Sequence, residues 1–207
     1  MSVASRRVGI FGGSFDPVHN AHIALARQAL VQLALDEVVW VPAGHPWQKR
    51  RAPAPAHHRE AMVALAVENE PGFTLSRLEL DRDGPSFTVD TVRELRAQRP
   101  GINWHLLIGQ DQFAALHTWH GWQALTTLAT LAVANRTTND GTVPPGGDPR
   151  VLRLPHETIA LPAMTVSSTG IRARLALGLG IDDLVPAAVA RYIARHHLYQ
   201  DPPPHRS

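Results

Sequence analysis

Short apolar runs alternate with segments of helical periodicity along most of this 207-residue chain. Six runs are candidate strands: Val8–Phe11, Glu37–Val41, Phe73–Leu80, Trp104–Ile108, Thr130–Ala134 and Val151–Leu154. Four of the six (the first, second, fourth and fifth) are short and largely apolar, as is typical of strands buried on both faces of a parallel sheet. Helical periodicity fills the intervals, at residues 21–34, 58–69, 88–98, 169–177 and 186–196. The alternation predicts right-handed βαβ units and an α/β fold with a doubly wound, mostly parallel sheet.

The composition is that of a globular protein with one core. Apolar residues make up 44% of the chain and charged residues 18%. The length favours one domain over residues 1–207, with its core at about 8–199 and a disordered tail at 200–207. No apolar run is long enough to span a bilayer, and the N-terminus lacks the apolar stretch of a secretory signal, so a cytoplasmic location is expected. The absence of cysteine excludes thiolate nucleophiles and cysteine-ligated metals.

The charge pattern argues against a nucleic-acid-binding surface. The formal net charge is +2, and the basic residues are scattered apart from Lys49, Arg50 and Arg51. Nucleic-acid binders usually concentrate basic residues on one face. Lys49 is the only lysine in a chain that otherwise uses arginine, which suggests either a role for its compact ammonium group or chance.

The first predicted strand runs into an unusual turn. Residues 12–17 read GGSFDP, and the first predicted helix follows with His19 and His22 in its first turn. Paired glycines let backbone N–H groups approach an anion, and a helix N-terminus favours phosphate. The two imidazoles share one helix face. The combination indicates a polyphosphate site, although the histidine spacing alone also fits a zinc site or two surface histidines. The turn is neither a GxGxxG dinucleotide motif nor a Walker A loop.

The turn and a second segment near the other end of the chain resemble a known superfamily. GGSFDPVHNAH resembles the first signature of the nucleotidylyltransferases, and VSSTGIRARLALG, residues 166–178, resembles their second. Four more segments look like those of bacterial nicotinate-nucleotide adenylyltransferases: HHREAMVALAV, PSFTVDTV, LLIGQDQFAALHTWHGWQAL and LVPAAVARYIARHHLY. The resemblance covers residues 8–199 and implies a Rossmann-like nucleotidylyltransferase fold.

This resemblance implies a reaction and assigns residues to it. AMP is transferred from ATP to nicotinate mononucleotide, which gives deamido-NAD and pyrophosphate in NAD biosynthesis. The implied catalytic residues are His19, His22, Lys49 and Arg172. The implied ATP-binding residues are Gly12, Gly13, Ser14, Phe15, His19, His22, Gly109, Asp111, Ser168, Thr169 and Arg172. The implied mononucleotide-binding residues are Asp16, Lys49, Ser86, Phe87, Thr88 and Trp119. Mg²⁺ would arrive with ATP, without a dedicated metal site, and neither nucleic acid nor a membrane is an expected partner.

Several of these residues also have a structural interpretation. Asp111 either binds ribose hydroxyls or caps the next helix. Trp119 is expected to stack on the pyridine ring, with Trp122 in the core. Ser168 is the expected N-cap of the helix at 169–177. The N–H groups of residues 86–88, at the start of a helix, would hold the nicotinate carboxylate and discriminate it from an amide.

The chain departs from the family pattern at three positions that bear on the site. Ala21 replaces the glycine of HxGH, Gln48 replaces the histidine before Lys49, and His120 replaces a tyrosine that often follows the first tryptophan of the WxxW segment. Arg136, just past a predicted strand, is a candidate for the border of the adenine site. Four further histidines have no assigned role and are expected on the surface: His57, His58, His196 and His197.

Two other functions stay open from the sequence alone. One is adenylyl transfer to another phosphate acceptor, either nicotinamide mononucleotide or phosphopantetheine. The other is a protein that keeps the fold and binds nucleotide without catalysis. The first would be separated by substrate competition, and the second by binding without pyrophosphate release.

Overall fold

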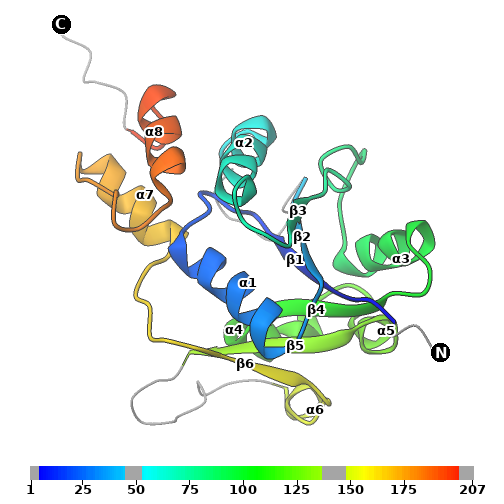
Figure 1. Ribbon diagram of the computed structural model, residues 1–207. Helices are drawn as coiled ribbons and strands as arrows, with labels where there is room; N and C mark the ends of the chain where they lie inside the picture. The colour runs from blue at the N-terminus through cyan, green and yellow to red at the C-terminus, as the bar shows by residue number, and fades with distance from the viewer. Residues whose placement is uncertain (1–4, 45–52, 137–147, 201–207) are drawn as a thin grey trace, which may run out of the picture.

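A computed structural model of the chain describes residues 5–44, 53–136 and 148–200. Its centre is a six-stranded sheet in the order β3-β2-β1-β4-β5-β6 (Figure 1). The strands are β1 Arg7–Gly13, β2 Glu37–Pro42, β3 Phe73–Leu75, β4 Asn103–Gly109, β5 Thr130–Arg136 and β6 Glu157–Leu161. Every neighbouring pair is parallel. The prediction of an α/β, doubly wound sheet is therefore confirmed, and the order reverses between β1 and β4.

Helices cover both faces of the sheet, so the protein has three layers. The α-helices are α1 Asn20–Gln32, α2 Ala56–Val67, α3 Thr88–Gln98, α4 Gln110–Ala114, α5 Trp122–Leu128, α6 Pro149–Leu152, α7 Ser168–Ala176 and α8 Ala187–Arg195. One buried apolar cluster joins α1, α2, α7 and α8 to the sheet. A second cluster, on the other face, joins α3, α4, α5 and α6 to it. The five helices expected from periodicity are all present, within two residues at each end.

Two of the six predicted strands are wrong in extent or type. Residues 151–154 lie in and just after the short helix α6, which begins because Pro149 occupies its first turn and the Asp148 carboxylate accepts a hydrogen bond from the Arg150 amide. The sixth strand is instead β6, Glu157–Leu161. It lies at the edge of the sheet and buries only Ile159 and Leu161, so its alternating pattern lacks the continuous apolar run of a central strand.

The strand expected over residues 73–80 ends early. β3 stops at Leu75, and the chain then turns at Arg77, whose guanidinium forms ion pairs with Glu60 of α2 and with Asp81. An Arg–Asp pair four residues apart suits a helical turn better than an extended strand. The short helix α5 and a 3₁₀ turn at Leu116–Thr118 were not predicted, and α4 was considered only as the helix that Asp111 would cap.

Candidate active site

Two glycines lie at the carboxyl ends of the adjacent central strands, where the strand order reverses. Gly12 lies near the end of β1, and Gly109 is the last residue of β4. A Cβ atom built on either glycine meets no heavy atom within 4 Å. Open α/β sheets bind ligands at the carboxyl ends of their strands, near such a reversal. The backbone at these two glycines is therefore accessible for contact with a ligand.

We expect Gly12→Ala and Gly109→Ala to leave the fold intact but to weaken nucleotide binding. The added methyl group enters open space, so the melting temperature should stay within about 2 °C of the wild type. The same methyl would occupy the volume through which a phosphate or ribose approaches the backbone, and we expect about a tenfold loss in ATP affinity by titration calorimetry. Unchanged affinity in both variants would place the ligand elsewhere.

His19 and His22 are held together at the start of α1. Their rings stack with centroids 3.6 Å apart. The backbone N–H of His19, the N-cap residue, donates to His22 Nδ1 at 3.2 Å. Since Nδ1 accepts this hydrogen bond, a neutral His22 carries its proton on Nε2. The geometry therefore fixes both the tautomer of His22 and the atom that it can present as a donor.

Phe15 supports His22 from below. Its side chain is 2% exposed, and its ring meets that of His22 edge-on, with centroids 5.2 Å apart. It also packs against Phe11 and Trp40. Phe15 has a φ of 45°, in the left-handed region that is uncommon for bulky residues. Its ring belongs to the core, which leaves its backbone as the part that could contact ATP.

The second sequence motif lies directly against the first. The helix α7 begins at Ser168, and its N-cap is Ser167, whose hydroxyl accepts from the Gly170 N–H. Ser168 was therefore wrongly predicted as the N-cap. Its hydroxyl instead donates to the Pro17 carbonyl at 2.9 Å, so it ties α7 to the turn after β1. Thr169 is exposed at the same helix N-terminus.

Arg172 of α7 reaches the same turn. Its Nη1 donates to the backbone oxygen of Asp16 at 2.7 Å, and its Nη2 donates to the hydroxyl of Thr169 at 3.2 Å. The guanidinium is mostly buried, with 17% of the side chain exposed. The two motifs, more than 150 residues apart in the sequence, thus meet at the turn after β1, where the start of α7 lies beside the start of α1 (Figure 1).

Asp16 is enclosed by protein groups. Its side chain is 5% exposed. Its Oδ1 accepts from the Ala54 N–H at 3.1 Å and from the Tyr199 hydroxyl at 2.8 Å. Its Oδ2 lies 3.7 Å from Arg172 Nη1. Asp16 was predicted to bind the mononucleotide. Its contacts favour a structural role instead, because they join the turn after β1 to Ala54, to Arg172 of α7 and to Tyr199 near the C-terminus.

Arg59 is a site residue that the sequence reasoning missed. It is 1% exposed and donates to three carbonyl oxygens, those of Ala54, Ser14 and Gly44. Burial lowers the pKa of this guanidinium, while the charge of Asp16 raises it. Its only sequence signal was a position within the HHREAMVALAV segment. Lys49, the fourth predicted catalytic residue, lies outside the described residues.

Four of the six predicted mononucleotide residues, Ser86, Phe87, Thr88 and Trp119, lie on the other face of the sheet. Ser86 and Phe87 precede α3, which begins at Thr88 as expected. The Phe87 ring packs on that of His120 with centroids 4.4 Å apart, so the N-terminus of α3 lies beside the segment that carries Trp119. The Ser86 hydroxyl is buried and has no hydrogen-bond partner within the described ranges.

Trp119 and Trp122 are both partly buried against the second core cluster. The expected division, with Trp119 for the ligand and Trp122 for the core, is therefore not visible in their burial. Asp111 is exposed in the first turn of α4. The N-cap of α4 is Gly109, without a side-chain capping bond, so the capping interpretation of Asp111 loses support and the ribose interpretation remains.

The histidines without an assigned role divide into two kinds. His57, His196 and His197 are exposed, as predicted. His58 is half-buried, contrary to the surface prediction, and its Nδ1 lies 3.0 Å from the Tyr192 hydroxyl of α8. The side chain of Arg136 lies outside the described part of the structure, so its predicted place beside adenine stays a prediction.

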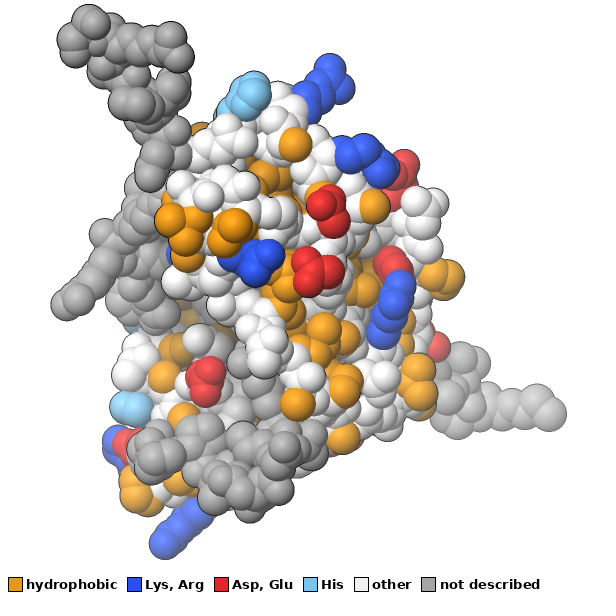
Figure 2. Space-filling model, turned by 90° about the vertical axis from the view of Figure 1, so that its left-hand side faces the viewer, with side chains coloured by type: hydrophobic (Ala, Val, Ile, Leu, Met, Phe, Trp, Pro, Cys, Tyr) orange, Lys and Arg blue, Asp and Glu red, His pale blue; other side chains and the backbone are white. Residues whose placement is uncertain are grey.

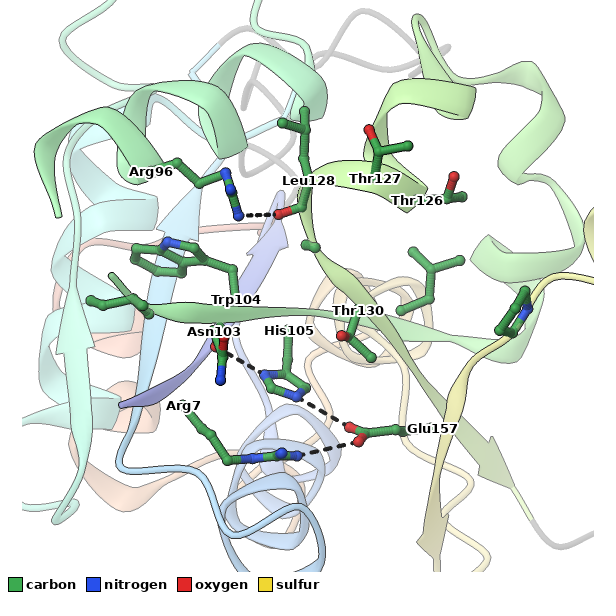
Figure 3. A pocket seen from close by; sticks show the side chains of 14 residues that line it. Arg7, Arg96, Asn103, Trp104, His105, Thr126, Thr127, Leu128, Thr130 and Glu157 are labelled. Atoms are coloured by element: carbon green, nitrogen blue, oxygen red, sulfur yellow. Dashed lines mark hydrogen bonds and ion pairs between the residues drawn. The ribbon is translucent and has the colours of Figure 1, made fainter. Parts of the chain in front are cut away.

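A pocket lies at the opposite edge of the sheet, at the amino ends of its strands. It has a volume of about 420 Å³ and is lined by the amino ends of β1, β4, β5 and β6. Figure 3 shows Arg7 and His105 pointing at Glu157, with distances of 3.2 Å and 3.3 Å, and Arg96 donating to the Leu128 carbonyl. Arg7 and Glu157 pair with each other, Arg96 bonds a backbone carbonyl, and burial lowers the pKa of His105. The phosphate motifs lie at the other edge of the sheet, so this pocket is not our candidate for the active site.

The described residues show no other chemical centre. On the face in Figure 2, basic side chains lie apart and among acidic ones, without a basic stripe. No group of three or more histidine or acidic residues in the described part of the chain could hold a metal ion. Among the same residues, no helix is long and apolar enough to cross a membrane.

Comparison with known proteins places this geometry in context. Residues 10–174 match the family described as cytidylyltransferase-like. A probable nicotinate-nucleotide adenylyltransferase of Methylibium petroleiphilum is 49% identical over 95% of this chain and 94% of its own. One from Leifsonia xyli is 39% identical over 94% of each chain. The solved Plasmodium falciparum nicotinic acid mononucleotide adenylyltransferase, complexed with NaAD, has the same fold, with a TM-score of 0.76, 19% identity, and coverage of 94% of this chain and 97% of that one.

Proposed function

The chain belongs to the cytidylyltransferase-like family and, within it, to the nicotinate-nucleotide adenylyltransferases, and we propose that it transfers AMP from ATP to nicotinate mononucleotide in NAD biosynthesis. The observation that carries the proposal is the junction of the two phosphate motifs, in which Ser168 and Arg172 bond directly to the turn that precedes His19 and His22. MgATP is the expected form of the nucleotide substrate.

The chemistry asks the protein for positioning and charge stabilisation. A phosphate oxygen of the mononucleotide attacks the α-phosphorus of ATP, and the bond from that phosphorus to the bridging oxygen breaks, which releases pyrophosphate. The attacking phosphate is already a competent nucleophile, so no covalent intermediate is needed. We assign Nε2 of His22 and the guanidinium of Arg172 to the developing negative charge on the phosphates. The bare backbone at Gly12 and Gly109 would admit the nucleotide.

We place the binding site for the acceptor, nicotinate mononucleotide, on the other face of the sheet, at the N-terminus of α3. The N-terminus of α3, at residues 86–88, offers backbone N–H groups to the nicotinate carboxylate. The buried hydroxyl of Ser86, which has no partner among the described residues, is a further donor in this place. Trp119 supplies an aromatic surface for the pyridine ring. A carboxylate gains more than an amide from a positive helix terminus, and this difference is the proposed origin of selectivity.

The test is pyrophosphate release from MgATP with nicotinate mononucleotide and nicotinamide mononucleotide in parallel. We expect turnover with the acid and at least tenfold less with the amide. Equal turnover would keep the reaction and overturn the account of selectivity. No release with either, followed by release with phosphopantetheine, would assign another acceptor. ATP binding without release in all three would indicate a non-catalytic protein.

We expect Trp119→Ala to raise the KM for nicotinate mononucleotide about fivefold, because a stacked aromatic ring contributes on the order of 1 kcal/mol. The KM for ATP should change less than twofold. Trp122→Ala is the matched control, since Trp122 has a similar degree of burial on the same segment. Initial rates at varied concentrations of each substrate measure both constants. Equal changes in both constants, together with a lower melting temperature, would return Trp119 to the core.

A further inference from the structure

The C-terminal segment after α8 turns back onto the first phosphate motif. His197 and Tyr199 both have positive φ, 50° and 64°, and the Leu198 N–H donates to the Ile193 carbonyl at 3.1 Å. This turn closes the end of α8 and directs Tyr199 inward, where its hydroxyl donates to Asp16 Oδ1 at 2.8 Å. A left-handed conformation is costly for a tyrosine, so the surrounding contacts must stabilise this placement.

The hydroxyl of Tyr199 is one of two donors on the same carboxylate oxygen. The Ala54 N–H is the other, so two hydrogen bonds fix the position of Oδ1 of Asp16. The remaining oxygen, Oδ2, lies 3.7 Å from Arg172 Nη1. This Nη1 is bonded to the Asp16 backbone oxygen at 2.7 Å. Arg172 is therefore held near Asp16 but does not form a close bidentate ion pair with its carboxylate. Such a pair would neutralise the charge of Arg172.

We propose that Tyr199 is a positioning residue for adenylyl transfer: through Asp16 it keeps the Arg172 guanidinium oriented toward the phosphates of ATP. The inference rests on the proposed function. Burial raises the pKa of the Tyr199 phenol, and the charge of Asp16 raises it further, so the hydroxyl stays protonated and donates at neutral pH. Without it, only the Ala54 N–H restrains Oδ1 of Asp16, and the carboxylate can turn further toward Arg172 and pair fully with it.

The chain offers a close control for this residue. It has two tyrosines, and the other, Tyr192, is on α8 and bonds His58 rather than the phosphate motif. Tyr199→Phe and Tyr192→Phe each remove one hydroxyl from the C-terminal region. We expect Tyr199→Phe to lower kcat/KM for ATP about tenfold with an unchanged KM for the mononucleotide. Tyr192→Phe should stay within about twofold of the wild type in both constants.

A double-mutant cycle with Arg172→Ala decides whether Tyr199 acts through Arg172. We expect Tyr199→Phe to cost about tenfold in the wild-type background and less than twofold in the Arg172→Ala background. An equal loss in both backgrounds, or no loss in the wild type, overturns the proposal. Equal changes in the KM of both substrates would indicate a merely structural role and overturn it too.

The proposed function can fail separately from this inference. If the wild type releases no pyrophosphate with any acceptor, the same cycle is measured on ATP affinity by titration calorimetry. If Tyr199→Phe binds ATP more weakly than Tyr192→Phe does, and this difference disappears in the Arg172→Ala background, the positioning of Arg172 is still supported. Affinities that are equal in the two tyrosine variants overturn it.

Discussion

His22→Ala is expected to fold normally and to release pyrophosphate about 100- to 1000-fold more slowly than the wild type, the range found when one preorganised transition-state donor is removed. The ring is held by three contacts that a ligand need not supply: the His19 N–H on Nδ1, the stacked His19 ring, and the edge of Phe15. Such a donor costs little reorganisation when charge develops on the phosphates. Single-turnover kinetics at saturating substrate measures the step directly.

Two variants separate the catalytic role of His22 from its structural one. Asparagine places an acceptor near the position of Nδ1, so His22→Asn preserves the bond from the His19 amide but lacks a donor at Nε2. Glutamine places its amide near Nε2 and can donate there. We expect His22→Asn to be nearly as slow as His22→Ala with a normal melting temperature, and His22→Gln to recover part of the rate. Near-normal turnover in a folded His22→Asn would refute the assignment.

The sequence predicts the centre of this fold better than its edges, for a physical reason. β1, β2, β4 and β5 are buried on both faces, and so they appear as continuous apolar runs. β6 packs on one neighbour and alternates, and the run at residues 151–154 that resembled a strand is governed by the cap at Asp148 and Pro149. Local sequence patterns identify a strand correctly when both its faces are buried. They mislead where the secondary structure depends on a position at the sheet edge or on a helix cap.

The site shows the same division. Gly12, His19 and His22 were recognisable because they belong to one local strand-to-helix connection, whereas Gly109 was named only through the resemblance. Ser168 and Arg172 needed the resemblance, since nothing local indicates that they bond to Pro17 and Asp16. Arg59 and Tyr199 were passed over altogether: an arginine in a polar helix start and a tyrosine near the C-terminus gain meaning only when tertiary structure brings them to one buried turn.

Loss of Arg59 should strongly destabilise the fold. Its guanidinium bonds carbonyl oxygens in three separate loops. These are Ser14 after β1, Gly44 after β2 and Ala54 before α2. None of these three carbonyls lies in a helix or strand ladder. Removing the guanidinium would leave them without this donor and would also remove the positive charge near the enclosed carboxylate of Asp16.

We therefore expect Arg59→Leu to lower the free energy of unfolding by about 3–5 kcal/mol, the usual loss when one partner of a buried charged network is removed. Arg93→Leu is the control, because Arg93 forms an exposed pair with Asp90 that is worth less than about 1 kcal/mol. Arg59→Lys should fall between them, since an ammonium keeps the charge but cannot span three carbonyls. Urea unfolding measures all three variants, and where the leucine variant is not recovered folded, the lysine variant is compared with the control. If an Arg59 variant were as stable as the Arg93 control, the three loops would be held by their own packing, and the guanidinium would not contribute to the free energy of unfolding.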